Sequence, residues 1–279
     1  MKRIGVVGNP GGWSSERLAD AVERATGYRL LIDLPRVVAE LDRGHVLFED
    51  TDLGELDAIV IKKTGREYAP EHFDRLELLR YVGAAGVPIF SKPERISRVL
   101  NRATCTITLA ANDIPMPPTV ITEDVDEAVR SVERYGRAVL KPLLSTKARG
   151  MRVVEADGDV RAELERFCAN GNPVIYVQQM IELPDRDLGV TFLGGEYLAT
   201  YARVRQEGST WNTTTRAGGR YSAHDTSASV IELARRAQAP FELDFTSVDV
   251  AETAGGPVVF EVSAFGGFRG LLEGCDVDA

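Results

Sequence analysis

Two acidic residues near the end of the chain, Asp249 and Glu261, lie where a β-hairpin would bring them face to face. They belong to the alternating apolar runs Thr246–Ala251 and Val258–Val262, which flank the turn-forming letters TAGGP and therefore predict a hairpin. A turn centred near Gly255 places the two carboxylates opposite each other on one side of the ribbon. Because opposed carboxylates repel, such a pair normally binds a cation or shares a proton.

The same register puts Ser247 opposite Ser263 beside the acidic pair, so the predicted site offers oxygen atoms only. Oxygen ligands without His or Cys suit Mg²⁺, which prefers carboxylates supplemented by water and substrate phosphates. We therefore expect Asp249 and Glu261 to bind Mg²⁺. The alternative is an exposed hairpin face with solvated acids, and a shift of one residue in the register would remove the prediction.

A lysine, Lys141, interrupts the apolar strand AVLKP. An unpaired ammonium is costly to bury, so we expect Lys141 to meet an anion. The loop that follows supplies hydroxyls, cations and a flexible backbone position, in the order Ser145, Thr146, Lys147, Arg149 and Gly150. Such a loop can close over phosphates, although its composition also suits a surface loop with solvated charges. The chain has no phosphate-binding loop of the GxxxxGKS or GxxxxGKT kind.

The alternating segment YARVR places Arg203 and Arg205 on one face of a predicted strand, and Asn212 and Arg216 follow between Thr-rich and Gly-rich residues. Guanidinium groups that converge on one site make bidentate phosphate contacts and stabilise the charge that develops in phosphoryl transfer. Taken singly, each arginine is more often a surface ion-pair residue. Together with the lysine loop and the acidic hairpin, the arginines favour a nucleoside triphosphate site.

Short strands alternate with helices over the first ninety residues. The predicted strands are Arg3–Val7, Tyr28–Leu34, Val46–Glu49, Leu56–Ile61 and Val87–Phe90. One predicted helix is capped by Ser14 or Ser15, and another covers Glu71–Ala84. This alternation favours a parallel sheet covered by helices, with ligands at the carboxyl ends of its strands.

The remaining residues predict two further parts. The first has helices over Arg98–Asn112, from Val125 to a stop at Gly136 and over Val160–Ala169, and strands over Ala138–Lys141, Met151–Glu155 and Val174–Gln178. From Asp187 onward we expect mainly strands, with one helix over Ser227–Ala237. The predicted fold class is therefore α/β and α+β: an N-terminal parallel α/β domain (residues 1–92), a small central α+β lid module (93–180) and a C-terminal, mainly antiparallel α+β module (181–279).

Composition argues against several classes of function. The 279 residues include 42 acidic and 33 basic ones, a net charge of −9, so we expect no general nucleic-acid partner. The three cysteines and three histidines are scattered, which indicates free thiols and no His-built zinc site. The first apolar run is too short for a signal peptide, and no stretch is long enough for a membrane span. We therefore expect a cytoplasmic protein without a membrane partner.

From about Ser91 onward, the sequence resembles the ATP-grasp carboxylate–amine ligases of the RimK type (ribosomal protein S6 glutamate ligase-like). NRATCTITLAANDIPMPPT resembles the family's entry segment, AVLKP and STKARGMRVV its phosphate-binding strand and loop, VIYVQQMIE its hinge and VVFEVSAFGG its metal-binding strand. The ending VFEVSAFGGFRG and the segment WNTTTR also resemble a bacterial subgroup, the GAK-system ATP-grasp enzymes. The resemblance implies an ATP-grasp fold.

The resemblance also implies a role for individual residues. The nucleotide would contact Arg102, Lys141, Thr146, Lys147, Gln178, Gln179, Met180, Ile181, Asp187 and Asn212, with the backbone of Gln179 to Ile181 around adenine and Asp187 on the ribose. Arg203 and Arg216 would be catalytic, and Asp249, Glu261 and Ser263 would hold the metal. Ser263 stands where an asparagine is usual, which puts one of two metal positions in doubt. Arg102 replaces a usual lysine, and Gln179 replaces an acid common in the hinge.

The implied reaction is ATP-dependent amide formation through an acyl phosphate. It requires ATP and one or two Mg²⁺ ions, with Mn²⁺ as a possible substitute, and it joins an unidentified carboxylate acceptor to an amine, an amino acid such as glutamate. The N-terminal part, with GNPGGWSS and the pair Lys62 and Lys63, is expected to help bind the acceptor. The sequence leaves the oligomeric state open, a homo-oligomer included.

Two other functions stay open at this point. One is an ATP-binding sensor or scaffold derived from such a ligase, which the replacement at Ser263 keeps in play. The other is a dinucleotide enzyme that uses the GNPGG turn. The second is disfavoured because the chain lacks GxGxxG and a suitable acid about twenty residues later.

Overall fold

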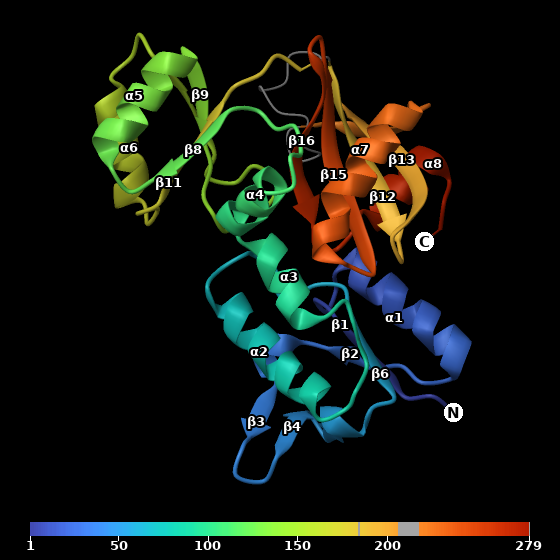
Figure 1. Cartoon of the computed structure of the whole chain (residues 1–279). Helices are drawn as coiled ribbons and strands as arrows, with labels where there is room; N and C mark the ends of the chain where they lie inside the picture. Colours follow the sequence, from blue (N-terminus) through green and yellow to red (C-terminus); the bar gives the residue numbers. More distant parts are fainter. Residues whose placement is uncertain (184, 206–217, 279) are drawn as a thin grey trace.

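The structure is a computed structural model that describes residues 1–183, 185–205 and 218–278. Its first part is a parallel four-stranded sheet in the order β2-β1-β6-β7 (Figure 1). The strands are β1 (Ile4–Val7), β2 (Leu31–Ile32), β6 (Ala58–Ile61) and β7 (Ile89–Phe90), and the helices are α1 (Trp13–Thr26) and α2 (Glu71–Ala84). The predicted parallel sheet is thus confirmed, and α2 has the predicted bounds.

Two predictions in this part were wrong. The run Val46–Glu49 does not join the parallel sheet: β3 (Val38–Glu40), β4 (His45–Phe48) and β5 (Thr51–Asp52) form a separate antiparallel sheet. The turns between these strands are too short for the crossover that parallel pairing requires. Helix α1 begins at Trp13 with Gly12 as its N-cap, so neither Ser14 nor Ser15 caps it. The Ser15 hydroxyl is buried and instead accepts a hydrogen bond from the Asn9 N–H at 3.0 Å.

The helix predicted over Arg98–Asn112 is broken into α3 (Pro93–Leu100) and α4 (Arg102–Ala110). Asn101 lies between them with an extended backbone, and its side chain accepts a hydrogen bond from the Thr104 N–H at 3.2 Å. This is a helix N-cap, which asparagine favours. As a consequence, Arg102 occupies the first position of α4.

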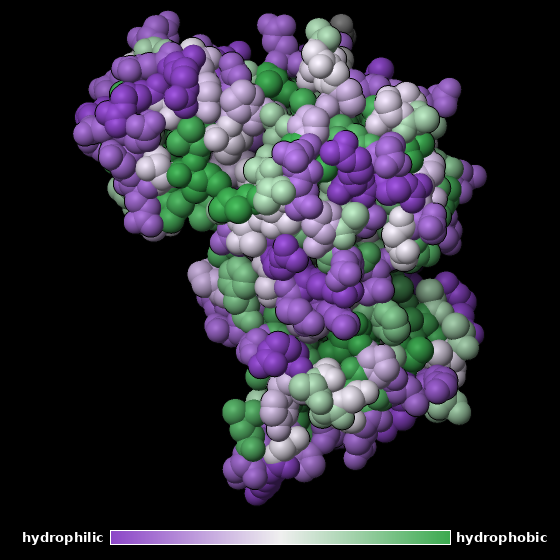
Figure 2. All heavy atoms as spheres, viewed as in Figure 1, coloured by the Kyte–Doolittle hydropathy of each residue, from purple (hydrophilic) through white to green (hydrophobic). Residues whose placement is uncertain are grey.

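The central part is an antiparallel sheet in the order β10-β9-β11-β8, on which α5 (Val125–Tyr135) and α6 (Val160–Ala169) pack. Its strands are β8 (Thr119–Thr122), β9 (Arg137–Leu140), β10 (Arg152–Glu155) and β11 (Ile175–Gln179). Figure 2 shows that the outer face of this part is mainly hydrophilic. Its buried apolar side chains, such as Leu140 and Phe167, form a cluster of their own.

The last part is an antiparallel five-stranded sheet in the order β14-β13-β12-β15-β16. Its elements are β12 (Arg186–Leu193), β13 (Glu196–Val204), β14 (Arg220–Ala223), α7 (Ala228–Gln238), β15 (Phe245–Thr253), β16 (Gly256–Ser263) and α8 (Phe268–Cys275). Its buried side chains form one continuous cluster with those of the N-terminal part. Figure 1 shows the central part standing apart from these two, with α3 and α4 running between them.

The prediction of one helix after Asp187 was wrong, because α8 is a second helix in this part. Its glycines lower the helical propensity of its sequence. The helix nevertheless packs closely on the ring of Tyr201: a Cβ at Gly270 would lie 2.7 Å from that ring, and one at Gly274 would lie 3.0 Å from the Tyr201 Cβ. Glycine therefore serves the close approach of helix and sheet.

Candidate active site

A cavity of about 390 Å³ lies where the central and C-terminal sheets meet α4, a size that suits a small-molecule ligand. The residues to which the resemblance gives a role, so far as the structure describes them, all line this cavity: Arg102, Lys141, Thr146, Lys147, Gln178, Gln179, Met180, Ile181, Asp187, Arg203, Asp249, Glu261 and Ser263. The predictions for Asn212 and Arg216 fall outside the described residues. Arg205 does not line the cavity, and its guanidinium instead binds Asp185 at 2.7 Å.

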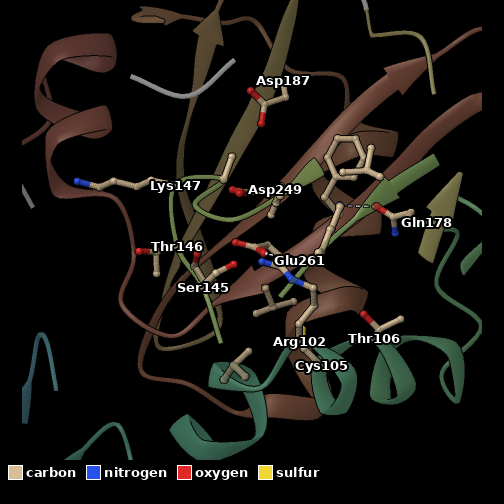
Figure 3. Close-up of a pocket in the computed structure, with 18 of the residues that line it drawn as sticks. Arg102, Cys105, Thr106, Ser145, Thr146, Lys147, Gln178, Asp187, Asp249 and Glu261 are labelled. Carbon is tan, nitrogen blue, oxygen red and sulfur yellow. Dashed lines mark hydrogen bonds and ion pairs between the residues drawn. The ribbon is translucent and has the colours of Figure 1, made fainter. Parts of the chain in front are cut away.

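The two acids of the hairpin are direct cross-strand partners, Asp249 on β15 and Glu261 on β16, as predicted. The register shifts next to them, because Val250 pairs with Val259. Phe260 is therefore an extra residue on β16, a β-bulge, and both Phe260 and Glu261 line the cavity. Figure 3 shows the two carboxylates side by side at the centre of the cavity.

Each carboxylate is paired with an arginine from a different element. Arg102 Nη1 lies 2.7 Å from Glu261 Oε2, and Arg203 Nη2 lies 3.0 Å from Asp249 Oδ2. Burial raises the pKa of Asp249 and outweighs the opposing effect of Arg203, and the nearby Glu261 adds to the rise. Burial acts in the same direction on Glu261, but the charge and hydrogen bond of Arg102 hold its pKa below the ordinary value.

One oxygen of the acidic pair has no partner. Asp249 Oδ1 is buried and accepts no hydrogen bond within the described residues, which is costly for a carboxylate oxygen. Ser263 lines the same cavity as the two acids, and no group of three His, Cys, Asp or Glu side chains that could hold a metal ion occurs in the part of the chain that the structure describes. This small set of oxygen atoms with one orphaned member fits Mg²⁺, which keeps several water or phosphate ligands.

Arg203 is held in place by Asp187, its cross-strand partner on β12. Its Nε lies 3.1 Å from each oxygen of Asp187, and its Nη2 contacts Oδ2 as well. Both side chains are largely buried, so the pair fixes the guanidinium beside Asp249. Asp187, for which the resemblance implies a contact with the ribose, is therefore paired with Arg203 in the structure.

Lys141 follows β9 and is 7 % exposed. Its ammonium donates a hydrogen bond of 2.5 Å to Gln178 Oε1 and lies 5.3 Å from the centre of the Phe260 ring. Gln178 in turn donates to Thr119 Oγ1 at 2.9 Å. Burial, and then the nearby charge of Arg102, lower the pKa of Lys141 to about 7. No acidic side chain pairs with this lysine in the described residues, so an incoming anion is its missing partner.

The loop predicted to cover phosphates runs along the cavity from Lys141 to β10. Thr146 and Lys147 line the cavity, and Figure 3 shows the Lys147 side chain pointing away from the acidic pair. The backbone has positive φ at Lys147 (57°), Ala148 (56°) and Gly150 (68°). This left-handed conformation favours glycine, and only the last of the three residues is one. Arg149 joins the loop to the N-terminal part through an ion pair of 2.6 Å with Glu67.

The hinge at the end of β11 offers an adenine ring fewer free backbone N–H groups than the resemblance implies. The Gln179 N–H donates to Pro118 O at 2.8 Å, and the Met180 N–H donates to Arg137 O at 3.0 Å. The Ile181 N–H makes no hydrogen bond within the described ranges. Among the three N–H groups, that of Ile181 is thus the one available to an adenine ring.

Two cavity residues come from the N-terminal part: Lys63, which belongs to the lysine pair expected to help bind the acceptor, and Tyr68, which was not among the predicted residues. Lys63 is the second residue after β6, and Tyr68 lies five residues further on. The lysine pair at 62 and 63 was a visible signal, because it ends an apolar strand of a parallel sheet. Tyr68 carried no signal in the sequence, since its position depends on contacts with residues almost two hundred positions away.

Comparison with known proteins shows the family of this chain. Residues 99–279 match the family model of the RimK-like ATP-grasp domain. The chain is 26% identical to the tetrahydromethanopterin:alpha-L-glutamate ligase of Methanosarcina acetivorans, over 91% of this chain and 83% of that protein. It is 29% identical to a ribosomal protein bS6–L-glutamate ligase of Escherichia fergusonii, over 66% of this chain and 61% of that protein.

A solved structure has the same fold. The ATP-grasp ligase PsnB, complexed with a phosphomimetic variant of its minimal precursor, Mg and ADP, superimposes with a TM-score of 0.75 at 20% identity, over 99% of this chain and 94% of that one. Within the described ranges, no helix is long and apolar enough to cross a bilayer. The matched family model covers more than half of the chain, so this protein belongs to the RimK-like ATP-grasp family of ligases.

Proposed function

We propose that this protein uses ATP and Mg²⁺ to join a carboxylate to the amine of an amino acid, with ADP and phosphate as the other products. The observation that carries the proposal is the pair Asp249 and Glu261, which face each other in a cavity with an orphaned carboxylate oxygen. Buried cations surround the pair. Such a site suits a metal-bound polyphosphate. The metal ion would be the partner of the opposed acids, and the phosphates would be the partners of the nearby cationic side chains.

The nucleotide would lie between the hinge and the acidic pair. The Ile181 N–H is available for adenine, and Lys141 lacks an anionic partner at the phosphate end. The relative PsnB was solved with Mg and ADP, which supports the same ligands here. Asn212 and Arg216 would add phosphate contacts, as the resemblance implies. The predicted boundaries after residues 92 and 180 would then place the nucleotide between the central and C-terminal modules.

Asp249 and Glu261 would hold Mg²⁺, which when bound neutralises phosphate charge. An oxygen of the acceptor carboxylate attacks the γ-phosphorus, and the bond to the ADP oxygen breaks. Arg203, fixed by Asp187, and Lys141 stabilise the charge on the transferring group. The amine nitrogen then attacks the acyl carbon of the acyl phosphate, phosphate leaves, and the nitrogen loses a proton.

The loop with Thr146 and Lys147 would exclude water from the acyl phosphate. Its connection to the N-terminal part through Arg149 and Glu67 supports such a covering position. We propose one Mg²⁺ bound by both carboxylates and a second, weaker position that Ser263 completes. Mn²⁺ could replace Mg²⁺ because it also accepts oxygen ligands.

Glutamate is the amine that the relatives favour, because the two curated proteins are named as glutamate ligases. The acceptors in those names, tetrahydromethanopterin and ribosomal protein bS6, differ in size and chemistry. We therefore propose glutamate as the amine substrate of this protein. Its acceptor carboxylate is to be identified by experiment.

The test is ligation by the full-length protein with MgATP, L-glutamate and a panel of carboxylates and peptides, with ADP release and product mass as readouts. We expect ADP and an amide product, both lost in Asp249→Asn. Glu252→Gln, on the same strand but outside the cavity, is the matched control and should keep the activity. Nucleotide binding without turnover across the panel would favour the sensor or scaffold function instead.

A further inference from the structure

Lys62 and Lys63, at the carboxyl end of β6, have different surroundings. The Lys62 ammonium is buried, donates to the backbone carbonyls of Phe265 and Gly266, and lies 3.8 Å from the centre of the Phe268 ring. This lysine thereby joins the N-terminal sheet to the segment that follows the metal-binding strand β16. Lys62 has a complete set of partners and is part of the framework.

Lys63 enters the cavity instead. Its ammonium lies 4.8 Å from the centre of the Phe265 ring, and its backbone N–H is held by Val7 O at 3.1 Å. No carboxylate pairs with Lys63 among the described residues. Burial, and then repulsion from Lys147, lower its pKa to about 8. A half-buried cation that faces a second cation and no acid is typical of an anion site.

Tyr68 lies on the same wall of the cavity. Its ring packs edge-on against Phe265, with centroids 6.4 Å apart, and against His72 at 5.4 Å. His72 is fixed by hydrogen bonds of 2.6 Å to Thr64 Oγ1 and to Glu67 O. The Tyr68 hydroxyl makes no hydrogen bond to any described residue, although it is close enough to Glu261 for that carboxylate to raise its pKa further after burial. It is thus a rigidly placed donor with no acceptor.

We propose that Lys63 and Tyr68 form the subsite for the acceptor carboxylate that is to be phosphorylated. The two groups supply a charge and a hydroxyl donor, the pair of contacts that a carboxylate needs. They come from the N-terminal part, whereas the hinge and Lys141 come from the central part. An acceptor there would thus reach the acidic pair from the side opposite the nucleotide.

This inference rests on the proposed function, and the first test is independent of turnover. Acetic anhydride labels neutral lysine amines, and mass spectrometry reads each position. With MgADP present, acetate and glutarate should slow the labelling of Lys63 in the full-length protein, relative to sodium chloride at equal ionic strength. The exposed Lys92 is the internal control and should be labelled at the same rate throughout.

Equal labelling of Lys63 in acetate, glutarate and chloride would overturn the assignment. Protection by L-glutamate, but by neither acetate nor glutarate, would also overturn it, because Lys63 would then bind the amine substrate. Either result leaves the ligase proposal intact, since that proposal is tested by ADP and amide formation.

The second test uses variants and traps the acyl phosphate with hydroxylamine. Lys63→Met should raise the KM for the carboxylate about 10- to 100-fold, the effect of a lost charge-assisted hydrogen bond, with the affinity for MgADP unchanged. Lys63→Arg should restore most of the loss, and Tyr68→Phe should raise the same KM by a smaller factor. An unchanged carboxylate KM in Lys63→Met, or an equal loss of MgADP affinity, would contradict the assignment.

Discussion

The guanidinium of Arg102 donates to the carboxylate of Glu261 across 2.7 Å and thereby joins the first turn of α4 to the middle of β16. Arg203 makes the equivalent contact with Asp249. Each of the two acids is thus paired with an arginine. If a metal–nucleotide complex binds as proposed, Asp249 and Glu261 would hold the Mg²⁺, and Arg102 and Arg203 would be left to contact phosphate.

Asp187→Asn should destabilise the protein by about 3 kcal/mol, because it leaves the buried Arg203 with one carboxylate in place of two. Asp185→Asn is the matched control: it lies two residues away and pairs with Arg205, but its side chain is 81% exposed. The control should cost at most about 1 kcal/mol. Urea unfolding at neutral pH measures both, and equal losses would contradict the structural role of Asp187.

Affinity for ADP in the absence of Mg²⁺ should fall as the pH rises above about 7. The pKa of the free Lys141 is lowered to about 7, so the free protein loses this charge above that pH, whereas bound phosphates favour the charged form. Binding then takes up a proton, and the Kd for ADP rises by up to about tenfold per pH unit. Calorimetry in buffers of different ionisation enthalpy detects the proton. Lys141→Met should bind more weakly at pH 6 and lose the slope, whereas Lys92→Met should keep it.

Ser263→Ala should raise the Mg²⁺ concentration for half-maximal turnover by about 10-fold, the usual effect of removing a group that supports a metal site. Ser263→Asn restores the ligand that is usual in the family and should lower that concentration below the wild-type value. A magnesium titration of the ADP-release rate measures both changes. An identical magnesium dependence in all three proteins would show that Ser263 takes no part in metal binding.

Glu67→Gln should free the phosphate-covering loop, because it removes the ion pair with Arg149 at 2.6 Å. Both side chains are more than one third exposed, so the effect is limited to about 1 kcal/mol, or about fivefold in the open population. Trypsin cleavage after Lys147 should accelerate by that factor, and saturating MgADP should suppress it. Glu71→Gln, four residues along, is the control and should leave the cleavage rate unchanged.

The sequence predicted the pairing of Asp249 with Glu261 correctly. It did so although the turn is tighter than predicted, because a bulge that the sequence does not reveal corrects the register. Thr253 pairs with Gly256, so the turn is one residue tighter than a turn centred on Gly255. The bulge at Phe260 restores the register at Asp249. A bulge depends on the packing of the strand, here of Phe260 near Lys141, and alternation in the sequence carries no trace of it.

Other parts of the site depend on contacts between distant residues. Asp187 on β12 pairs with Arg203 on β13, whereas the resemblance implied that Asp187 contacts the ribose. The sequence predicted one continuous helix across Asn101, because the residues on both sides of it favour a helix. Local patterns therefore predicted the elements and most cavity residues, whereas the partners of the charged groups required the tertiary structure.

Transfer of ¹⁸O tests the central claim most directly. A carboxylate acceptor found by the panel, labelled with ¹⁸O, is incubated with the protein, MgATP and L-glutamate, and the released phosphate is analysed by mass spectrometry. Attack of the carboxylate on the γ-phosphorus predicts one ¹⁸O atom in each phosphate and none with Asp249→Asn. Phosphate without ¹⁸O, formed together with the amide, would contradict the account.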